Sequence, residues 1–495
     1  MDFSNFYRQR AIRATSLLYV AALAGTASIA QADELSDLKA QSEAANRQNQ
    51  ELNKRIDQLE QRQQKLEGKP GAAPAGGDDS LTWNGITLYG AIDLGVTYQT
   101  HGTPTNQAYG DDYFISKNST KARLLAAPNA LSASNVGLKG DINLFPGWAA
   151  VFKVETVFIP TSGQIADPVK SLAQNNGVAQ ANQNSNGDSS RAGQLFNNQA
   201  YFGVSSPTYG TLTFGRQYSL GLDNVVAYDP MGGAPAFSLI GYQGATSGGG
   251  VTESARLDAA LKYRFNLGPA RIGTLYQFGS AGNTGRGAYQ LNVGTDAGKF
   301  SVDAVFSKVY DAIAAASLSA AQVVQVPTLP TNSLAGTISD NTAWMLSAKY
   351  DLDRVRLFAG YSHMLFQNPS TALSPGANAQ GGYLLSVVNN TAFTNHKVLQ
   401  VYWTGAKWAA TPNLDITAAY YHENQNSFSG NGCSDASLAT CAGTEDAFSL
   451  VADYRINKHF DVYTGAMYSK VGGGIANGFF HTASIDPTVG ARLRF

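Results

Sequence analysis

The sequence predicts an all-β fold, a sixteen-stranded antiparallel transmembrane β-barrel preceded by a short α-helical coiled coil. From residue 81 onward, apolar and polar side chains alternate in segments of about ten residues, as in strands with one face in lipid and the other in water. The segment 488–495 shows this best, because Val489, Ala491, Leu493 and Phe495 alternate with glycine and arginine. Composition agrees, with 51 Gly, 24 Tyr, 23 Phe and only 14% charged residues.

Residues 1–32 are predicted to form a secretory signal peptide. Arg8, Arg10 and Arg13 precede an apolar run that ends in small residues, which suits cleavage after Ala32. The run is too short and too interrupted for a permanent spanning helix. The mature chain is therefore expected to start at Asp33 in an oxidising compartment.

Residues 33–67 are predicted to form the coiled coil. One heptad position is nearly all leucine, with Leu38, Leu52, Leu59 and Leu66, while the other core position is half polar. Such a helix needs partner helices held nearby, and a solvated single helix is the alternative. Gly68 and Pro70 end the helix, and residues 68–80 are expected to be a flexible linker.

Residues 81–495 are expected to form the barrel, with sixteen candidate strands. The connections between them alternate in length: 206–209 and 266–269 are tight, whereas 159–197 and 219–253 are long. Outer-membrane barrels have short periplasmic turns and long extracellular loops, so this sorting favours a barrel over a sandwich. Basic and acidic residues are equal in number in this region, which argues against a nucleic-acid-binding protein.

Both cysteines, Cys433 and Cys441, lie in one segment rich in small residues. An exported chain meets oxidising conditions, so a disulfide that closes a short loop is expected. Two cysteines eight residues apart without a nearby histidine supply too few ligands for a metal.

Different short motifs follow one another along residues 86–495: Leu88–Asp93, Val136–Gly140, Asn198–Val204, Gly210–Gln217, and Asp453–Tyr454 with the end at Phe495. Together they resemble the trimeric general-diffusion porins of Gram-negative bacteria, especially the β-proteobacterial type. The resemblance implies a homotrimer in the outer-membrane lipid that passes small hydrophilic solutes and ions. It also implies a third extracellular loop, here 219–253, folded into the lumen. The coiled coil departs from that pattern and suggests a periplasmic or cell-wall partner.

Strand alternation assigns several charged side chains to the lumen. Lys139, Lys153 and Glu155 lie between positions that face lipid, and Arg256 is assigned inward in the same way. Facing the lumen does not by itself place a residue at the narrowest point.

The resemblance implies an arginine ladder on the barrel wall opposite acidic groups of the third loop, and charges at a narrowing select ions. Arg216 and Arg256 match family arginines, whereas Asn135 stands where the family has another. For both arginines a loop-anchoring salt bridge is the alternative. Asp223 and Asp229 are the acidic candidates, with a solvated or capping carboxylate as the alternative.

Arg216 shares strand parity with Leu212 and Phe214, which are expected to face lipid. A bulge at Gly215 would therefore be required to turn Arg216 into the lumen.

We expect no enzymatic activity and no cofactor. The sequence has no Walker-type phosphate loop, no G-x-S-x-G motif and no second histidine at metal spacing after His422. The alternatives to a general porin are a more substrate-selective channel, or an outer-membrane tether or adhesin that uses the coiled coil.

Overall fold

The computed structural model describes residues 81–102, 105–110, 113–119, 121–185, 190–241, 255–279, 287–325, 330–430, 432–433 and 437–495. The predicted signal peptide, coiled coil and linker lie outside these residues.

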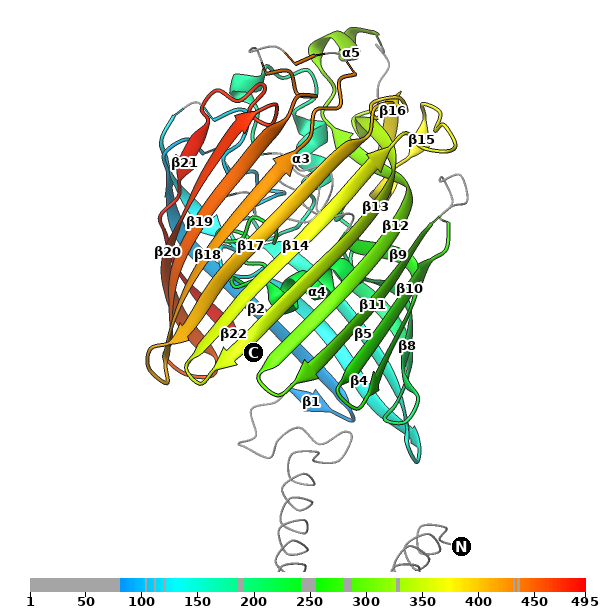
Figure 1. Cartoon of the computed structure of the whole chain (residues 1–495), viewed down its shortest axis with the longest axis vertical. Helices are drawn as coiled ribbons and strands as arrows, with labels where there is room; N and C mark the ends of the chain where they lie inside the picture. Colours follow the sequence, from blue (N-terminus) through cyan, green and yellow to red (C-terminus); the bar gives the residue numbers. More distant parts are fainter. Residues whose placement is uncertain are drawn as a thin grey trace, which may run out of the picture. The chain divides into compact units, whose positions relative to one another are not determined.

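Within the described residues, 16 long strands form one closed antiparallel barrel, as predicted (Figure 1). They are β2 (Ile86–Gln99), β4 (Asn135–Phe145), β5 (Trp148–Ile159), β7 (Gln199–Ser206), β8 (Gly210–Tyr218), β9 (Arg256–Leu267), β10 (Ala270–Gln277), β11 (Ala288–Ala297), β12 (Phe300–Ala316), β13 (Ser333–Leu352), β14 (Val355–Gln367), β17 (Lys397–Ala409), β18 (Leu414–Gln425), β19 (Gly443–Arg455), β20 (Phe460–Gly473) and β22 (Thr488–Arg494). Each pairs with the next in this order, and β22 pairs with β2 to close the ring. No unpaired edge therefore remains in the barrel wall.

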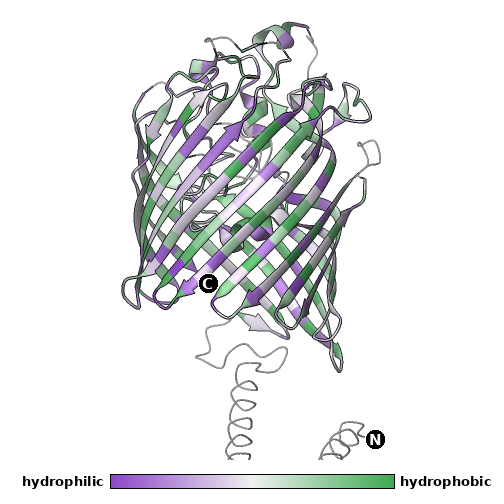
Figure 2. Cartoon of the chain, viewed as in Figure 1, coloured by the Kyte–Doolittle hydropathy of each residue, from purple (hydrophilic) through white to green (hydrophobic). Residues whose placement is uncertain are grey.

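Side chains alternate between the two faces of the wall, and Figure 2 shows the mixed hydropathy along the strands. Phe152, Phe202 and Phe214 lie side by side in register, and Phe202 is 68% exposed on the outer face. Lys139, Lys153 and Tyr201 form the adjacent inward row. Since registered neighbours share a face, the lipid and lumen faces follow directly from the sequence period.

The two ends of the barrel differ in their connections. Tight turns and the short strand β1 (Thr82–Trp83) lie at the end that carries the C-terminus (Figure 1). Long loops at the other end carry β6 (Gln164–Ile165), α3 (Pro168–Gln174), η1 (Gln180–Asn182), α5 (Ala320–Gln325), β15 (Ala377–Asn378), η2 (Gln380–Gly382), β16 (Leu384–Asn389) and β21 (Ala483–Ile485). In the part of the chain that the structure describes, no helix has the length and apolar character needed to span a membrane.

A small apolar core joins three long loops at that end. Val169 and Leu172 of α3 pack with Leu334 and Leu385. Asp167 caps α3 by accepting a hydrogen bond from the Lys170 amide at 2.9 Å. The Tyr383 hydroxyl also donates to it at 2.9 Å. Burial raises the pKa of the Asp167 carboxyl, because its charged form is removed from water. The loops therefore form a packed cap rather than separate arms.

The part of the chain that pairs with β2 after the first loop is divided into two strands. β3 (Arg123–Pro128) pairs with the upper half of β2 and β4 with the lower half, so residues 129–134 leave the sheet. The Asp93 carboxylate holds this excursion by accepting from the Leu131 and Ser132 amides at 2.9 and 2.7 Å. The Ala130 carbonyl in this excursion accepts a hydrogen bond from the third long loop.

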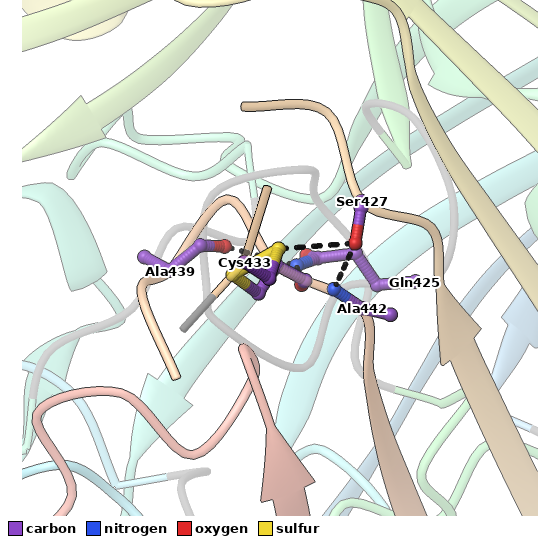
Figure 3. Close-up of a disulfide and its surroundings, with 6 residues drawn as sticks. Gln425, Ser427, Cys433, Ala439 and Ala442 are labelled. Carbon is purple, nitrogen blue, oxygen red and sulfur yellow. Dashed lines mark hydrogen bonds between the residues drawn. A yellow bond between two sulfur atoms is a disulfide. The ribbon is translucent and has the colours of Figure 1, made fainter. Parts of the chain in front are cut away.

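Cys433 and Cys441 form a disulfide with their Cα atoms 5.5 Å apart, in the loop between β18 and β19 (Figure 3). The Ser427 hydroxyl accepts from the Ala442 amide at 2.9 Å, and the Gln425 amide donates to the Ala439 carbonyl at 2.9 Å. The disulfide and these bonds hold the loop base against the end of β18.

Candidate pore constriction

The third long loop enters the lumen, where it forms α4 (Leu220–Tyr228) (Figure 1). Ser219 begins the helix, because its hydroxyl accepts from the Leu222 amide at 3.0 Å. The loop is described from residue 219 to 241. For residues 219–241 the predicted inward folding of this loop is therefore confirmed.

Hydrogen bonds fasten α4 and the residues after it to successive strands. The Leu220 amide donates to Gln290 of β11 at 2.7 Å, and Ser347 of β13 donates to Asn224 at 2.5 Å. Further along, the Trp403 indole of β17 donates to the Tyr228 carbonyl at 3.1 Å. The loop is thus held across the inner wall from β11 to β17.

Apolar packing accompanies these bonds. Leu220, Val225, Leu239 and Ile240 of the loop are buried in one cluster with inward residues of the wall, among them Met345, Met364, Val401, Trp403 and Tyr421. Gly405 permits the closest approach, because an added Cβ there would lie 2.5 Å from Pro230 Cγ and 2.4 Å from the Ala418 carbonyl oxygen. This half of the lumen is occupied by packed side chains.

The loop also reaches β20 and the β3–β4 excursion. Phe237 packs edge-on against Tyr463 with ring centroids 6.2 Å apart, and the Ala236 amide donates to the Ala130 carbonyl at 2.9 Å. Tyr463 in turn donates to Asp93 at 2.5 Å. The loop therefore contacts the barrel on both sides of the closing seam.

The opposite wall, formed by β2, β4, β5 and β7–β9, carries the predicted charges. Glu155 accepts from Tyr89 at 2.6 Å and lies 3.1 Å from the Lys153 ammonium. Both Lys139 and Lys153 lie over the Tyr89 ring, at 5.3 and 5.5 Å from its centroid. Lys139, Lys153 and Glu155 thus form one connected inward cluster, which we call the charged wall.

Arg256 joins the charged wall through Asn198 and Tyr218. Its Nε donates to Asn198 Oδ1 at 2.6 Å, and its guanidinium lies 5.2 Å from the Tyr218 ring centroid. Asn198 also donates to Glu155 and to the Tyr218 hydroxyl. The sequence-based grouping of Arg256 with Lys153 and Glu155 therefore corresponds to contacts in the structure.

Arg216 has a different environment. The register between β8 and β9 shifts after Gly215, which has φ +136°, so an irregularity lies where the sequence required a bulge. Yet Arg216 is only 8% exposed, and its nitrogens donate to the Ser190 and Asn197 carbonyls and to Asp258 at 2.6 Å. Its donors hold the 190–197 segment, which is the loop-anchoring alternative.

Asp223 lies on α4 but does not face Arg256 as an unpaired charge. Its carboxylate pairs with both Lys262 and Arg264 of β9. Lys262 also donates to the Tyr218 carbonyl at 2.9 Å. The acidic side of the loop is therefore neutralised by two neighbouring basic groups.

Asp229 lies away from the charged wall and is 2% exposed. Its oxygens accept from the Tyr421 hydroxyl at 2.6 Å and from the Gly233 and Met231 amides at 2.6 and 3.3 Å. Burial raises the pKa of this carboxyl, although the hydrogen bonds oppose the rise. The position is that of a buried carboxylate that holds the turn after α4.

Sequence reasoning missed the wall residues that receive the loop, such as Met345, Val401 and Trp403. A signal existed, because β13 and β17 carry apolar residues on both faces, as a strand covered on both sides does. Among the described residues, no group of three or more histidine, cysteine, aspartate or glutamate side chains is arranged to hold a metal.

Comparisons with known proteins agree on one family. A family model described as Gram-negative porin matches residues 20–474. An outer membrane porin protein of Bordetella pertussis is 29% identical over 179 residues, and the match spans 36% of this chain and 38% of that protein.

Solved structures show a similar fold. An anion-selective porin from Comamonas acidovorans has a TM-score of 0.53 at 15% identity, with 83% of this chain and 99% of that chain covered. The trimer form of OmpT, an outer membrane protein of Vibrio cholerae, has a TM-score of 0.50 at 12% identity, with 83% and 99% covered. At such identities the likeness concerns the barrel fold.

Proposed function

This chain belongs to the Gram-negative porin family, and we propose that it forms a water-filled channel for passive diffusion of small hydrophilic solutes and ions across the outer membrane. The observation that carries the proposal is the asymmetric lumen, in which the loop packs against one wall through apolar side chains while the other wall carries the linked charges of Lys139, Lys153 and Glu155. Fold and family are those of a channel rather than of an enzyme. The short-turn end of such a barrel faces the periplasm.

We further propose that the passage prefers anions. Glu155 is surrounded by donors from Tyr89, Asn198 and Lys153, and Asp223 is shared by two basic groups. Lys139 has no carboxylate at salt-bridge distance among the residues that the structure describes. The uncompensated charge on this wall is therefore positive, and a positive lining favours anions. The Comamonas acidovorans structure is of a porin described as anion-selective, which is consistent with this proposal.

Bilayer conductance with reversal potential in a KCl gradient tests both statements. Lys139→Gln should shift the reversal potential toward cations. One charge changes the energy of each ion by about 0.5 kcal/mol at roughly 8 Å in a water-like dielectric. The change has opposite signs for anions and cations, so the anion-to-cation permeability ratio should fall about fivefold. Lys308→Gln is the matched control. Lys308 donates to Thr342 beside the exposed row of β12, outside the lumen, and should leave the ratio unchanged.

Absence of defined conductance steps would contradict the channel and favour the tether alternative. Conductance with an unchanged ratio in Lys139→Gln would contradict only the charged-wall preference.

A homotrimer is the proposed assembly. The OmpT structure described as a trimer form has the same fold, and the predicted coiled coil at 33–67 would gain from tethering, which raises effective concentration to the millimolar range. A periplasmic or cell-wall partner for that segment is proposed on the same basis. Sedimentation of the detergent-solubilised protein measures the assembly, and a monomer would contradict it. Deleting residues 33–80 should leave conductance intact, because the strands begin after them.

A further inference from the structure

A cavity of about 280 Å³ lies between α4 and the inner wall, away from the charged wall. It is lined by Leu220, Asp223, Asn224, Ala227, Tyr228, Arg264, Arg271, Asn292, Asp296, Ser301, Asp303 and Lys349. The wall residues come from the ends of β9–β13 that adjoin the tight turns. The cavity therefore lies toward the end of the barrel opposite the packed loops.

Charges of both signs line this cavity in equal number. Arg271 pairs with Asp296 and lies 3.3 Å from Asp303, and Arg264 pairs with Asp223. Lys349 has no carboxylate at salt-bridge distance among the described residues. Its ammonium lies 4.8 Å from the Tyr228 ring centroid and 3.4 Å from the Ala227 carbonyl oxygen. Lys349 is therefore held by a ring face and a carbonyl oxygen rather than by a carboxylate.

Asn224 of α4 also lines the cavity. The side chain is 3% exposed, and its oxygen accepts from Ser347 at 2.5 Å. Its Nδ2 is buried and has no hydrogen-bond partner within the described part of the chain. Because this nitrogen is closed to water, an acceptor bound in the cavity meets the Lys349 ammonium rather than this group.

The Asp296 and Asp303 carboxylates of the lining limit the charge of the solute that can bind in the cavity. Asp303 accepts from Asn292 at 3.3 Å as well as from Arg271, and the Asp296 side chain is 58% exposed. Each carboxylate has about four acceptor positions, so both retain capacity for a further donor. A phosphate or other multiply charged anion would meet repulsion from them, and a simple cation would meet repulsion from Lys349 and the arginines.

We propose that this cavity is a binding subsite for a small zwitterion with the chemistry of a free α-amino acid. The carboxylate of the solute accepts from Lys349, and its ammonium donates to Asp296 and Asp303. The volume corresponds to about nine waters at roughly 30 Å³ each, which suits a solute of a few heavy atoms with some water. The inference rests on the proposed function, because the solute reaches the cavity through the channel lumen.

Equilibrium binding to the full-length, detergent-solubilised protein tests this subsite. The probes are L-alanine, propionate, which lacks the amino group, and ethylammonium, which lacks the carboxylate. Saturation-transfer NMR should give alanine a Kd at least about tenfold lower than either single-charge probe, since only alanine satisfies both ends. Equal affinity for propionate would reduce the cavity to a simple anion site and overturn the proposal. Absence of saturable alanine binding would also overturn it.

Variants locate the binding. Lys349→Met should raise the Kd for alanine about tenfold, while Lys349→Arg should restore most of the affinity. Asp303→Asn should weaken alanine binding but not propionate binding, because propionate has no ammonium and gains from the loss of a nearby negative charge. Lys299→Met is the matched control, because Lys299 lies at the nearby turn, is 55% exposed and pairs with Asp353 outside the cavity. An equal effect of Lys299→Met would overturn the assignment to this cavity.

Channel conductance without added alanine separates the two proposals. Normal conductance together with equal binding of alanine and propionate contradicts the subsite alone. Absence of conductance contradicts the proposed channel. The three-probe comparison on the unmodified protein decides the subsite even if a variant does not fold.

Discussion

The two sides of the barrel lumen use the same strand geometry for different purposes. On β4, β5 and β9, inward positions carry Lys139, Lys153, Glu155 and Arg256, which lie outside the apolar cluster that the third loop forms with the wall. On β13, β14 and β17, inward positions carry methionine, valine and tryptophan, which pack against the third loop. An inward position in a barrel can therefore be either pore lining or core, and the residue type distinguishes the two.

The apolar wall holds the third loop in place inside the lumen. The loop does not hang freely, because its apolar side chains are buried against the wall and its polar backbone groups bond to strand side chains. Burial of apolar area is non-directional, so hydrogen bonds such as that from Trp403 fix the position along the wall. The apolar side thus determines how far the loop lies from the charged side.

The largest effect is expected when Trp403, which holds the third loop against the wall, is truncated. Trp403 is 3% exposed, and Trp403→Ala would lose both its packing and its bond to the Tyr228 carbonyl. Such truncations cost about 3–5 kcal/mol. The loop should leave the wall, so single-channel conductance and cleavage within residues 219–241 should both increase.

Trp344→Ala is the control for this change. Trp344 lies on the outer face, is 44% exposed and stacks on His363 rather than on the loop. It should leave conductance unaltered. If Trp403→Ala keeps the parent conductance and protease resistance, apolar packing does not position the loop.

The sequence predicts the barrel well because alternation, turn spacing and family motifs all depend on local order. The same alternation predicts Lys139, Lys153, Glu155 and Arg256 on the inner face, and for Arg256 the family resemblance agrees. It fails to separate Arg216 and Asp229 from pore-lining charges. Their partners, the Ser190 and Asn197 carbonyls and the Tyr421 hydroxyl, are distant in sequence or lie in loops. Long-range hydrogen bonds of this kind have no sequence period.

A smaller effect is expected when one hydrogen bond to the buried Asp229 carboxylate is removed. Tyr421→Phe removes only the hydroxyl that donates to Asp229, and loss of a buried hydrogen bond to a carboxylate costs about 1–3 kcal/mol. The loop should stay docked but fluctuate more, which single-channel recording would show as increased current noise. The reversal potential should not move, because Asp229 remains buried between the loop and β18.

Tyr420→Phe provides a close control for Tyr421→Phe. Tyr420 also donates to a carboxylate, Asp446 at 2.7 Å, but it packs against Phe448 on the outer face. Its removal should not change current noise. A shift of reversal potential in Tyr421→Phe would instead show that Asp229 contributes charge to the lumen, as the sequence had suggested.

The smallest effect on the channel is expected at the disulfide, which belongs to neither side of the lumen. Cys433 and Cys441 close a short loop, for which the chain-entropy contribution is about 2–3 kcal/mol. Replacing both with serine should make the β18–β19 loop more sensitive to protease, while conductance and selectivity stay unchanged. Reduction of the parent protein should have the same consequence. A changed reversal potential in the double variant would mean that this loop helps to shape the passage, and thiol labelling of the unreduced parent protein would show that the bond does not form.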